Sequence, residues 1–135
     1  MNGDGVPPEV ADFITKHVDS VVQLETLLLL AGDPGRRWTA DDVSRELRID
    51  RGWAEAQLDV LCARSLLACD AEAVRHYRYA PADARTRDTV AALAKAYSER
   101  RVTVTGLIFA KPHDDVLRAF SDAFRIRKDK GGPRG

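Results

Sequence analysis

Few residues in this sequence have the types and spacing that catalysis or metal binding requires. The three histidines, His17, His76 and His113, are far apart along the chain. Cys62 and Cys69 lack the C-x-x-C spacing of a redox or zinc-binding pair. They could approach His76, but three ligands without a fourth make a poor zinc site. We therefore expect no enzyme, no cofactor and no metal site, and we expect both thiols to be small apolar groups in a reducing compartment.

The composition indicates a globular chain without an overall charge bias. Of 135 residues, 44% are hydrophobic and 31% are charged, and 21 basic residues balance 21 acidic ones. This length suits a single domain over residues 1–135. No apolar run is long enough to span a bilayer, and the first ten residues lack the pattern of a signal peptide, so we expect a soluble cytoplasmic protein.

The first half of the chain predicts several short helices, each preceded by a residue that favours a helix start. A short strand can form at residues 36–38, before the third of these helices. Pro7 and Pro8 can begin a helix that ends at about residue 17, Ser20 can cap a helix at 21–32, and Thr39 can cap one at 40–48. Asp50 can cap the next helix, whose apolar face holds Ala54, Leu58 and Leu61.

A β-hairpin is predicted next. "LLACD" at 66–70 is typical of a strand, "AEAV" of a turn, and "RHYRYAP" at 75–81 of the returning strand. Because side chains alternate along a strand, Tyr77 and Tyr79 should share one face.

Helices are expected to follow the hairpin. Asp83 can cap a long helix whose apolar spacing continues to residue 108. The β-branched run at 101–109 could instead be a strand, but the resumed helical spacing favours a helix. A last helix over about 114–127 would carry Phe120 and Phe124 on one face.

The apolar residues between positions 39 and 67 have the spacing of a known sequence motif. Leu58-x-x-Leu61-x-x-x-Ser65-Leu66-Leu67 is similar to the L-x-x-L-x-x-x-G-L-[VI] of bacterial winged helix-turn-helix regulators, a group that includes MarR-, ArsR- and PadR-type repressors. Ser65 stands where glycine is usual. The other positions that carry the likeness are Thr39, Val43, Leu47, Ile49 and Ala54.

The resemblance implies a fold and a function. The fold would be mainly α with a small β-wing: a winged helix-turn-helix core at 20–80, and extra C-terminal helices at 84–128 for dimerisation or packing. The function would be that of a DNA-binding transcriptional regulator, a homodimer that places the second helix of the motif in the major groove of double-stranded DNA. Such regulators often hold a small-molecule effector beside the dimer helices, where Tyr97 and Phe109 could line a pocket.

The helix after Asp50 and the hairpin provide the candidate DNA contacts. Arg51 can reach guanine or phosphate, Gln57 can pair with adenine, and Glu55 can accept from cytosine. The hairpin residues would meet phosphates, as could two arginines of the preceding strand. These residues are Arg75, His76 and Arg78 in the hairpin, and Arg36 and Arg37 before it.

The same helix also favours an alternative. Glu55 and Asp59 carry negative charge onto the face that would approach phosphates, and Trp53 is unusual in a groove. The chain could instead be a winged-helix protein–protein interaction module that does not bind DNA. Trp53, or the stripe formed by Phe120 and Phe124, would then dock the protein partner.

Overall fold

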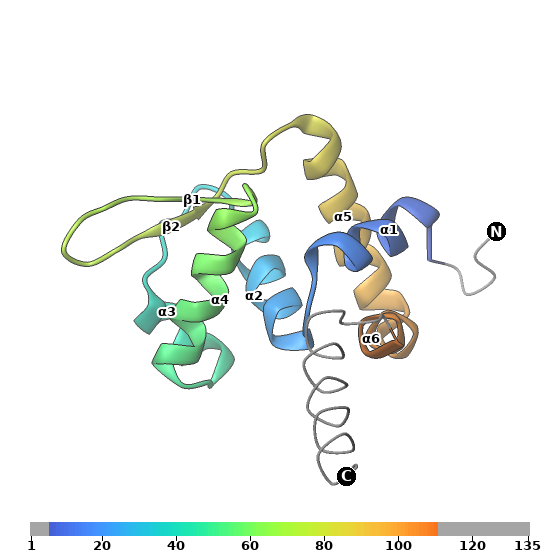
Figure 1. The fold of residues 1–135 in the computed structure, drawn as a ribbon, viewed down its shortest axis with the longest axis horizontal. Coiled ribbons are helices and arrows are strands. Elements are labelled where there is room, and N and C mark those ends of the chain that lie inside the picture. Colours follow the sequence, from blue (N-terminus) through green and yellow to red (C-terminus); the bar gives the residue numbers. More distant parts are fainter. Residues whose placement is uncertain (1–5, 111–135) are drawn as a thin grey trace, which may run out of the picture.

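The computed structural model describes residues 6–110, which form six helices and one two-stranded sheet (Figure 1). The predicted last helix, with Phe120 and Phe124, lies outside the described residues. The elements are α1 (Pro8–His17), α2 (Val21–Ala31), α3 (Ala40–Leu47), α4 (Arg51–Ala63), β1 (Leu67–Cys69), β2 (Tyr77–Tyr79), α5 (Ala84–Glu99) and α6 (Arg101–Ala110).

The helix starts follow the capping chemistry that the sequence predicts. Ser20, Thr39, Asp50 and Asp83 each accept a hydrogen bond from a backbone N–H in the first turn of the helix that follows. At α3 the Asp42 carboxylate also accepts from the Thr39 backbone N–H, which completes a capping box. The boundaries of these helices are therefore set by local side chains.

Helices α3 and α4 pack against each other, and α4 packs on α2. Residues 48–50 join α3 to α4, with Arg48 in the left-handed conformation at φ 59°. The Ser44 hydroxyl donates to the Ile49 carbonyl at 2.6 Å and fixes this turn. Ala54, Leu58 and Leu61 of α4 are fully buried, so the opposite side of α4 faces outward. This is a helix-turn-helix.

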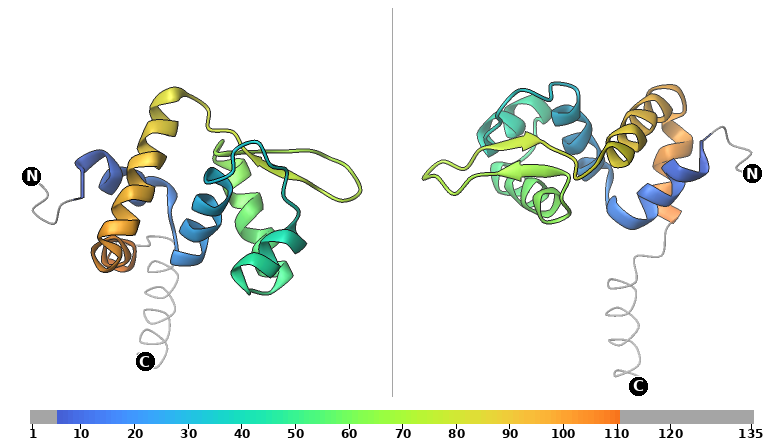
Figure 2. Two further views of the ribbon diagram at one scale, coloured as in Figure 1. Left: turned by 180° about the vertical axis from the view of Figure 1, so that it is seen from behind. Right: turned by 90° about the horizontal axis from the view of Figure 1, so that it is seen from above.

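The two strands pair antiparallel, with Leu67 opposite Tyr79 and Cys69 opposite Tyr77. The predicted strand at 36–38 is reduced to one bridge, in which Trp38 and Tyr77 exchange backbone hydrogen bonds of 2.8 and 2.7 Å. The loop between the strands projects away from the helices (Figures 1 and 2). It forms the wing.

The expectation of one long helix after Asp83 is wrong, although the helical prediction for 101–109 is confirmed. Arg100 leaves the helical conformation at φ −135° and ψ 52°, which separates α5 from α6. The break lets α6 pack against α1 and bury Val104 and Ile108, while Val90 and Leu93 of α5 are buried as well.

Figure 1 shows α1, α5 and α6 on one side of the molecule, and α2, α3, α4 and the sheet on the other. Buried side chains from both groups join one hydrophobic cluster, which runs from Val10 in α1 through Leu24 in α2 to Tyr77 in β2. Over residues 6–110, none of the helices has both the length and the apolar character needed to cross a membrane.

Candidate nucleic-acid interface

The outward face of α4 lies beside the wing. It carries the predicted DNA contact Arg51 and also the acidic residues Glu55 and Asp59, whose negative charge would repel phosphate. Arg51, Gly52, Trp53 and Ala56 are exposed on this face. The side chain of Asp50 holds the first turn by accepting from the Trp53 N–H at 3.2 Å. The face therefore presents one large aromatic side chain, Trp53, among small and charged residues.

Arg51 and Glu55 are brought together as an ion pair. Arg51 Nη1 lies 3.4 Å from Glu55 Oε1, and Arg51 Nε lies 2.8 Å from Asp41 Oδ1 in α3. A guanine or phosphate must compete with two carboxylates for this guanidinium. Because the pairs are exposed, their strength is modest and the competition is feasible.

Gln57 is directed toward α2. Its Oε1 accepts a 3.2 Å hydrogen bond from Nε2 of Gln23, a residue only 3% exposed. Gln23 in turn accepts from Arg64 at 3.1 Å, so Gln57 belongs to a polar network under the helix. The structure does not bring Gln57 together with Arg51 and Glu55.

Asp59 connects α4 to the wing. Its Oδ1 accepts from the Tyr77 hydroxyl at 2.6 Å and from Arg75 Nη1 at 3.2 Å. Arg75 Nε also donates to the Asp70 carbonyl at 3.1 Å. Burial, followed by the hydrogen bond to Asp59, raises the pKa of Tyr77, so the phenol stays protonated and remains the donor. The carboxylate that appeared repulsive in the sequence is thus partly neutralised by the predicted DNA contact Arg75.

His76 lies at the base of the wing, and Arg78 extends from the outer face of β2. The His76 N–H donates to Asp70 Oδ1 at 3.1 Å, and its Nδ1 lies 3.6 Å from Asp70 Oδ2. Arg37 forms a 2.9 Å ion pair with the same Asp70 oxygen. Arg36 stacks on the Trp38 ring at 3.6 Å. Neighbouring carboxylates and the Trp38 ring therefore contact most of the side chains that the sequence predicts for a basic rim.

Residues 36–79, which contain the helix-turn-helix and the wing, carry equal numbers of basic and acidic side chains. Arg48 and Arg78 are both exposed, and within residues 6–110 neither forms an ion pair or a side-chain hydrogen bond. Sequence reasoning missed Arg48, although its place in the turn between the two motif helices could have indicated it. The charged residues over 36–79 are eight arginines (36, 37, 45, 48, 51, 64, 75 and 78) and eight acids (41, 42, 46, 50, 55, 59, 70 and 72).

An apolar pocket of about 770 Å³ lies between the end of α2, the end of β2 and the start of α5. Its walls include Leu28, Tyr79 and Val90. The expected lining residues do not contribute: Tyr97 is buried and donates to Glu25 at 2.9 Å, and Phe109 points outward. The volume is within the range of small-molecule sites, roughly 300–1,000 Å³.

Comparisons with known proteins agree with the fold. No protein-family model matches the sequence, and no curated protein does. The YusO protein from Bacillus subtilis is similar over 88% of this chain and 82% of that chain, with 17% identity and a TM-score of 0.51. MepR, a transcription regulator of the Staphylococcus aureus multidrug efflux pump MepA, has a TM-score of 0.49 and 14% identity, over 87% of each chain.

The adhesin competence repressor of Streptococcus pyogenes is also similar, with a TM-score of 0.47 and 15% identity, over 78% of this chain and 79% of that chain. Of these three structures, YusO alone has a TM-score above 0.5, and its likeness supports the fold. The predicted resemblance to winged helix-turn-helix regulators is confirmed at the level of architecture: mainly α, with a small β-wing and additional helices after it.

Proposed function

We propose that this chain is a cytoplasmic DNA-binding transcriptional regulator that acts as a homodimer. Helix α4 would enter the major groove, and the wing would lie along the phosphate backbone. The observation that carries the proposal is the exposed face of α4 beside a projecting hairpin, together with the exposed Arg48 and Arg78, which form no ion pair among residues 6–110. The proposal assigns no catalytic residue.

The proposed contacts differ in what binding requires of them. Arg78 and Arg48 can meet phosphate without breaking an ion pair within the described residues. Arg51 and Glu55 would have to separate before either could read a base. Arg75, His76 and Gln57 remain candidate contacts, but their present hydrogen bonds favour positioning the wing and α4.

The proposed dimer would use the helices after the wing. Val102 and Phe109 of α6 are 86% and 73% exposed, which is unusual for large apolar side chains on one short helix. Burying both against a second copy would remove this apolar surface from water. A symmetric dimer would present two wings and two copies of α4 to half-sites about one turn of DNA apart.

The test is a titration of fluorescent random-sequence duplex at several salt concentrations, together with sedimentation analysis of the free chain. Binding should weaken steeply as salt rises, and Arg78→Ala should weaken it and reduce the salt slope by about one contact. Lys16→Ala, at an exposed position of α1, removes the same charge outside both the proposed DNA-binding face and the helices after the wing, and is the matched control. Salt-insensitive binding, or equal losses in both variants, would contradict the proposal.

A second candidate function is supported by Trp53, which is 51% exposed at the start of α4. An exposed tryptophan beside a charge-balanced surface suits an anchor for a protein partner better than a groove contact. The chain would then be a protein–protein interaction module. In that case Trp53→Ala should abolish partner binding, and the unmodified chain should not bind duplex at low salt.

A further inference from the structure

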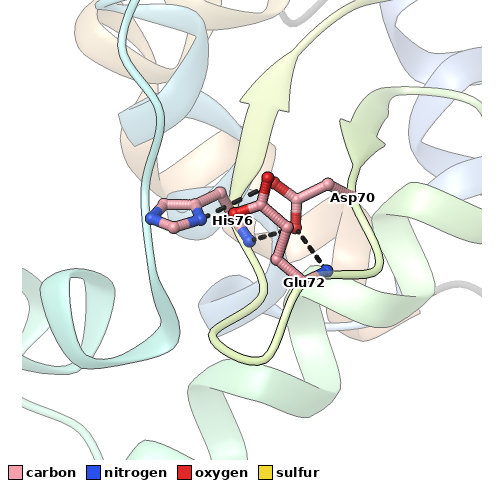
Figure 3. A group of neighbouring side chains, drawn as sticks. All are labelled: Asp70, Glu72 and His76. Atoms are coloured by element: carbon pink, nitrogen blue, oxygen red, sulfur yellow. Dashed lines mark hydrogen bonds and ion pairs between the residues drawn. The ribbon is translucent and has the colours of Figure 1, made fainter.

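Three side chains with metal-binding atoms converge at the base of the wing (Figure 3). Asp70 follows β1, His76 precedes β2, and Glu72 lies in the loop between them. One potential ligand atom from each residue lies within 4.8 Å of the others. The hairpin itself brings them together, because the Asp70 N–H donates to the His76 carbonyl at 3.2 Å.

The backbone fixes the Asp70 carboxylate in place. Oδ1 accepts from the N–H groups of Glu72 at 3.3 Å and His76 at 3.1 Å. These two bonds hold the carboxylate in one orientation. Oδ2 lies 3.6 Å from His76 Nδ1 and is paired with Arg37. Such support of a ligand is what a preorganised cation site requires.

The His76 imidazole provides an independent sign of a missing partner. Its Nδ1 is buried from solvent and has no hydrogen bond in the described structure. The atom lies 3.6 Å from Asp70 Oδ2, too far for a hydrogen bond. Buried polar atoms without partners are uncommon, and one facing a carboxylate is the arrangement that a cation between them would satisfy.

We propose that Asp70, Glu72 and His76 form a binding site for a divalent first-row transition cation such as Zn²⁺. Carboxylate oxygens and imidazole nitrogens both bind Zn²⁺, and an open zinc site has three protein ligands with water in the remaining position. The imidazole disfavours Mg²⁺ and Ca²⁺, which prefer oxygen ligands. The search of the sequence for cysteine–histidine clusters overlooked this site because two of its ligands are turn carboxylates.

Arg37 currently neutralises the same oxygens. Its Nη2 lies 2.9 Å from Asp70 Oδ2 and 3.8 Å from Glu72 Oε1, on a side chain that is more than half exposed. A bound cation would replace this guanidinium and release Arg37 toward solvent beside the wing. If the proposed DNA function holds, the released arginine can meet phosphate. The contact between Arg37 and phosphate rests on the proposed function. The metal site itself is independent of that function.

The experiment is a calorimetric titration of ZnCl₂ into the chelator-treated full chain, without DNA. One ion should bind per chain, and MgCl₂ and CaCl₂ should bind at least about tenfold more weakly. Glu72→Gln and His76→Gln should each weaken zinc binding by about tenfold or more. Arg37→Gln should strengthen it, because a competing cation is removed. Arg45→Gln, which removes an arginine paired with Asp42 elsewhere, should leave it unchanged.

Two further measurements locate the ion. Zinc should shift the backbone amide resonances of residues 70–76, and the double variant Cys62→Ser, Cys69→Ser should keep the affinity of the unmodified chain. Absence of saturable zinc binding, unchanged affinity in both ligand variants, or loss of binding in the cysteine variant would overturn the site. A weaker affinity in Arg37→Gln would overturn the exchange with Arg37.

Discussion

The Tyr77 hydroxyl in β2 donates a 2.6 Å hydrogen bond to the Asp59 carboxylate in α4, and Arg75 reaches the same oxygen at 3.2 Å. This contact joins the wing to the helix beside it, so it sets where the two proposed DNA-contacting elements lie relative to each other. Asp59 is therefore a positioning residue, although it lies on the face where a negative charge would hinder DNA binding.

Tyr77→Phe should lower the free energy of unfolding by about 1–2 kcal/mol. Hydrogen bonds to charged groups contribute about 1.5–3 kcal/mol, and partial exposure of Asp59 reduces that value. Urea denaturation measures the change. Tyr79→Phe is the matched control, because the Tyr79 hydroxyl has no hydrogen bond within residues 6–110. Equal losses in the two variants would show that the Asp59 contact contributes little.

The same pair predicts a dependence on alkaline pH. Burial raises the pKa of Tyr77 above its ordinary value of 10.0, so folding favours the neutral phenol. Its contribution to stability is complete below about pH 10 and is lost as the pH rises from there through the higher pKa of the folded state. Denaturation of Tyr77→Phe should therefore show a smaller loss of stability between pH 8 and pH 11, roughly. Identical pH profiles would refute this.

Glu55→Gln should increase the affinity for random duplex by several-fold at low salt. The change removes one negative charge from α4 and frees Arg51 from its 3.4 Å pair with Glu55. Fluorescence anisotropy in low-salt buffer measures it. Glu46→Gln on α3 removes the same charge without releasing an arginine, since Glu46 forms no ion pair in the described part of the chain. An equal gain in both variants would assign the effect to net charge alone.

Ser65→Gly should stabilise the fold by about 0.5–1 kcal/mol. Ser65 has φ 64°, a left-handed conformation that costs a residue with a Cβ more than it costs glycine. Thermal unfolding measures the change. Ser98→Gly, the same substitution at an exposed position of helix α5, should destabilise instead because glycine is a poor helix former. A loss of stability in Ser65→Gly would indicate a role for its side chain.

Ser65 also illustrates what the sequence could predict. Glycine is usual at this position in the resembling regulators, and the positive φ gives the physical reason. Helix caps and buried stripes were equally predictable, because they depend on residues a few positions apart. The pairing of Asp59 with Arg75, sixteen positions later, was not, because no local pattern encodes which exposed charges meet. The break at Arg100 was missed for a related reason: it depends on α1, which packs against α6.

Acid should weaken the start of the helix-turn-helix through Asp42. The hydrogen bond from the Thr39 backbone lowers the pKa of Asp42 below its ordinary value of 3.8, against the opposing effect of burial. Its contribution is present above that value and is lost as the pH falls through the lower pKa of the folded state. Asp42→Asn should therefore lose less stability than the unmodified chain between about pH 5 and pH 2.

Urea denaturation across this range measures the effect of Asp42→Asn. Asp33→Asn is the control, because no carboxylate hydrogen bond of Asp33 occurs among the described residues. Its acid dependence should match that of the unmodified chain. Persistence of full stability in the unmodified chain at low pH would show that the box does not depend on the ionised carboxylate.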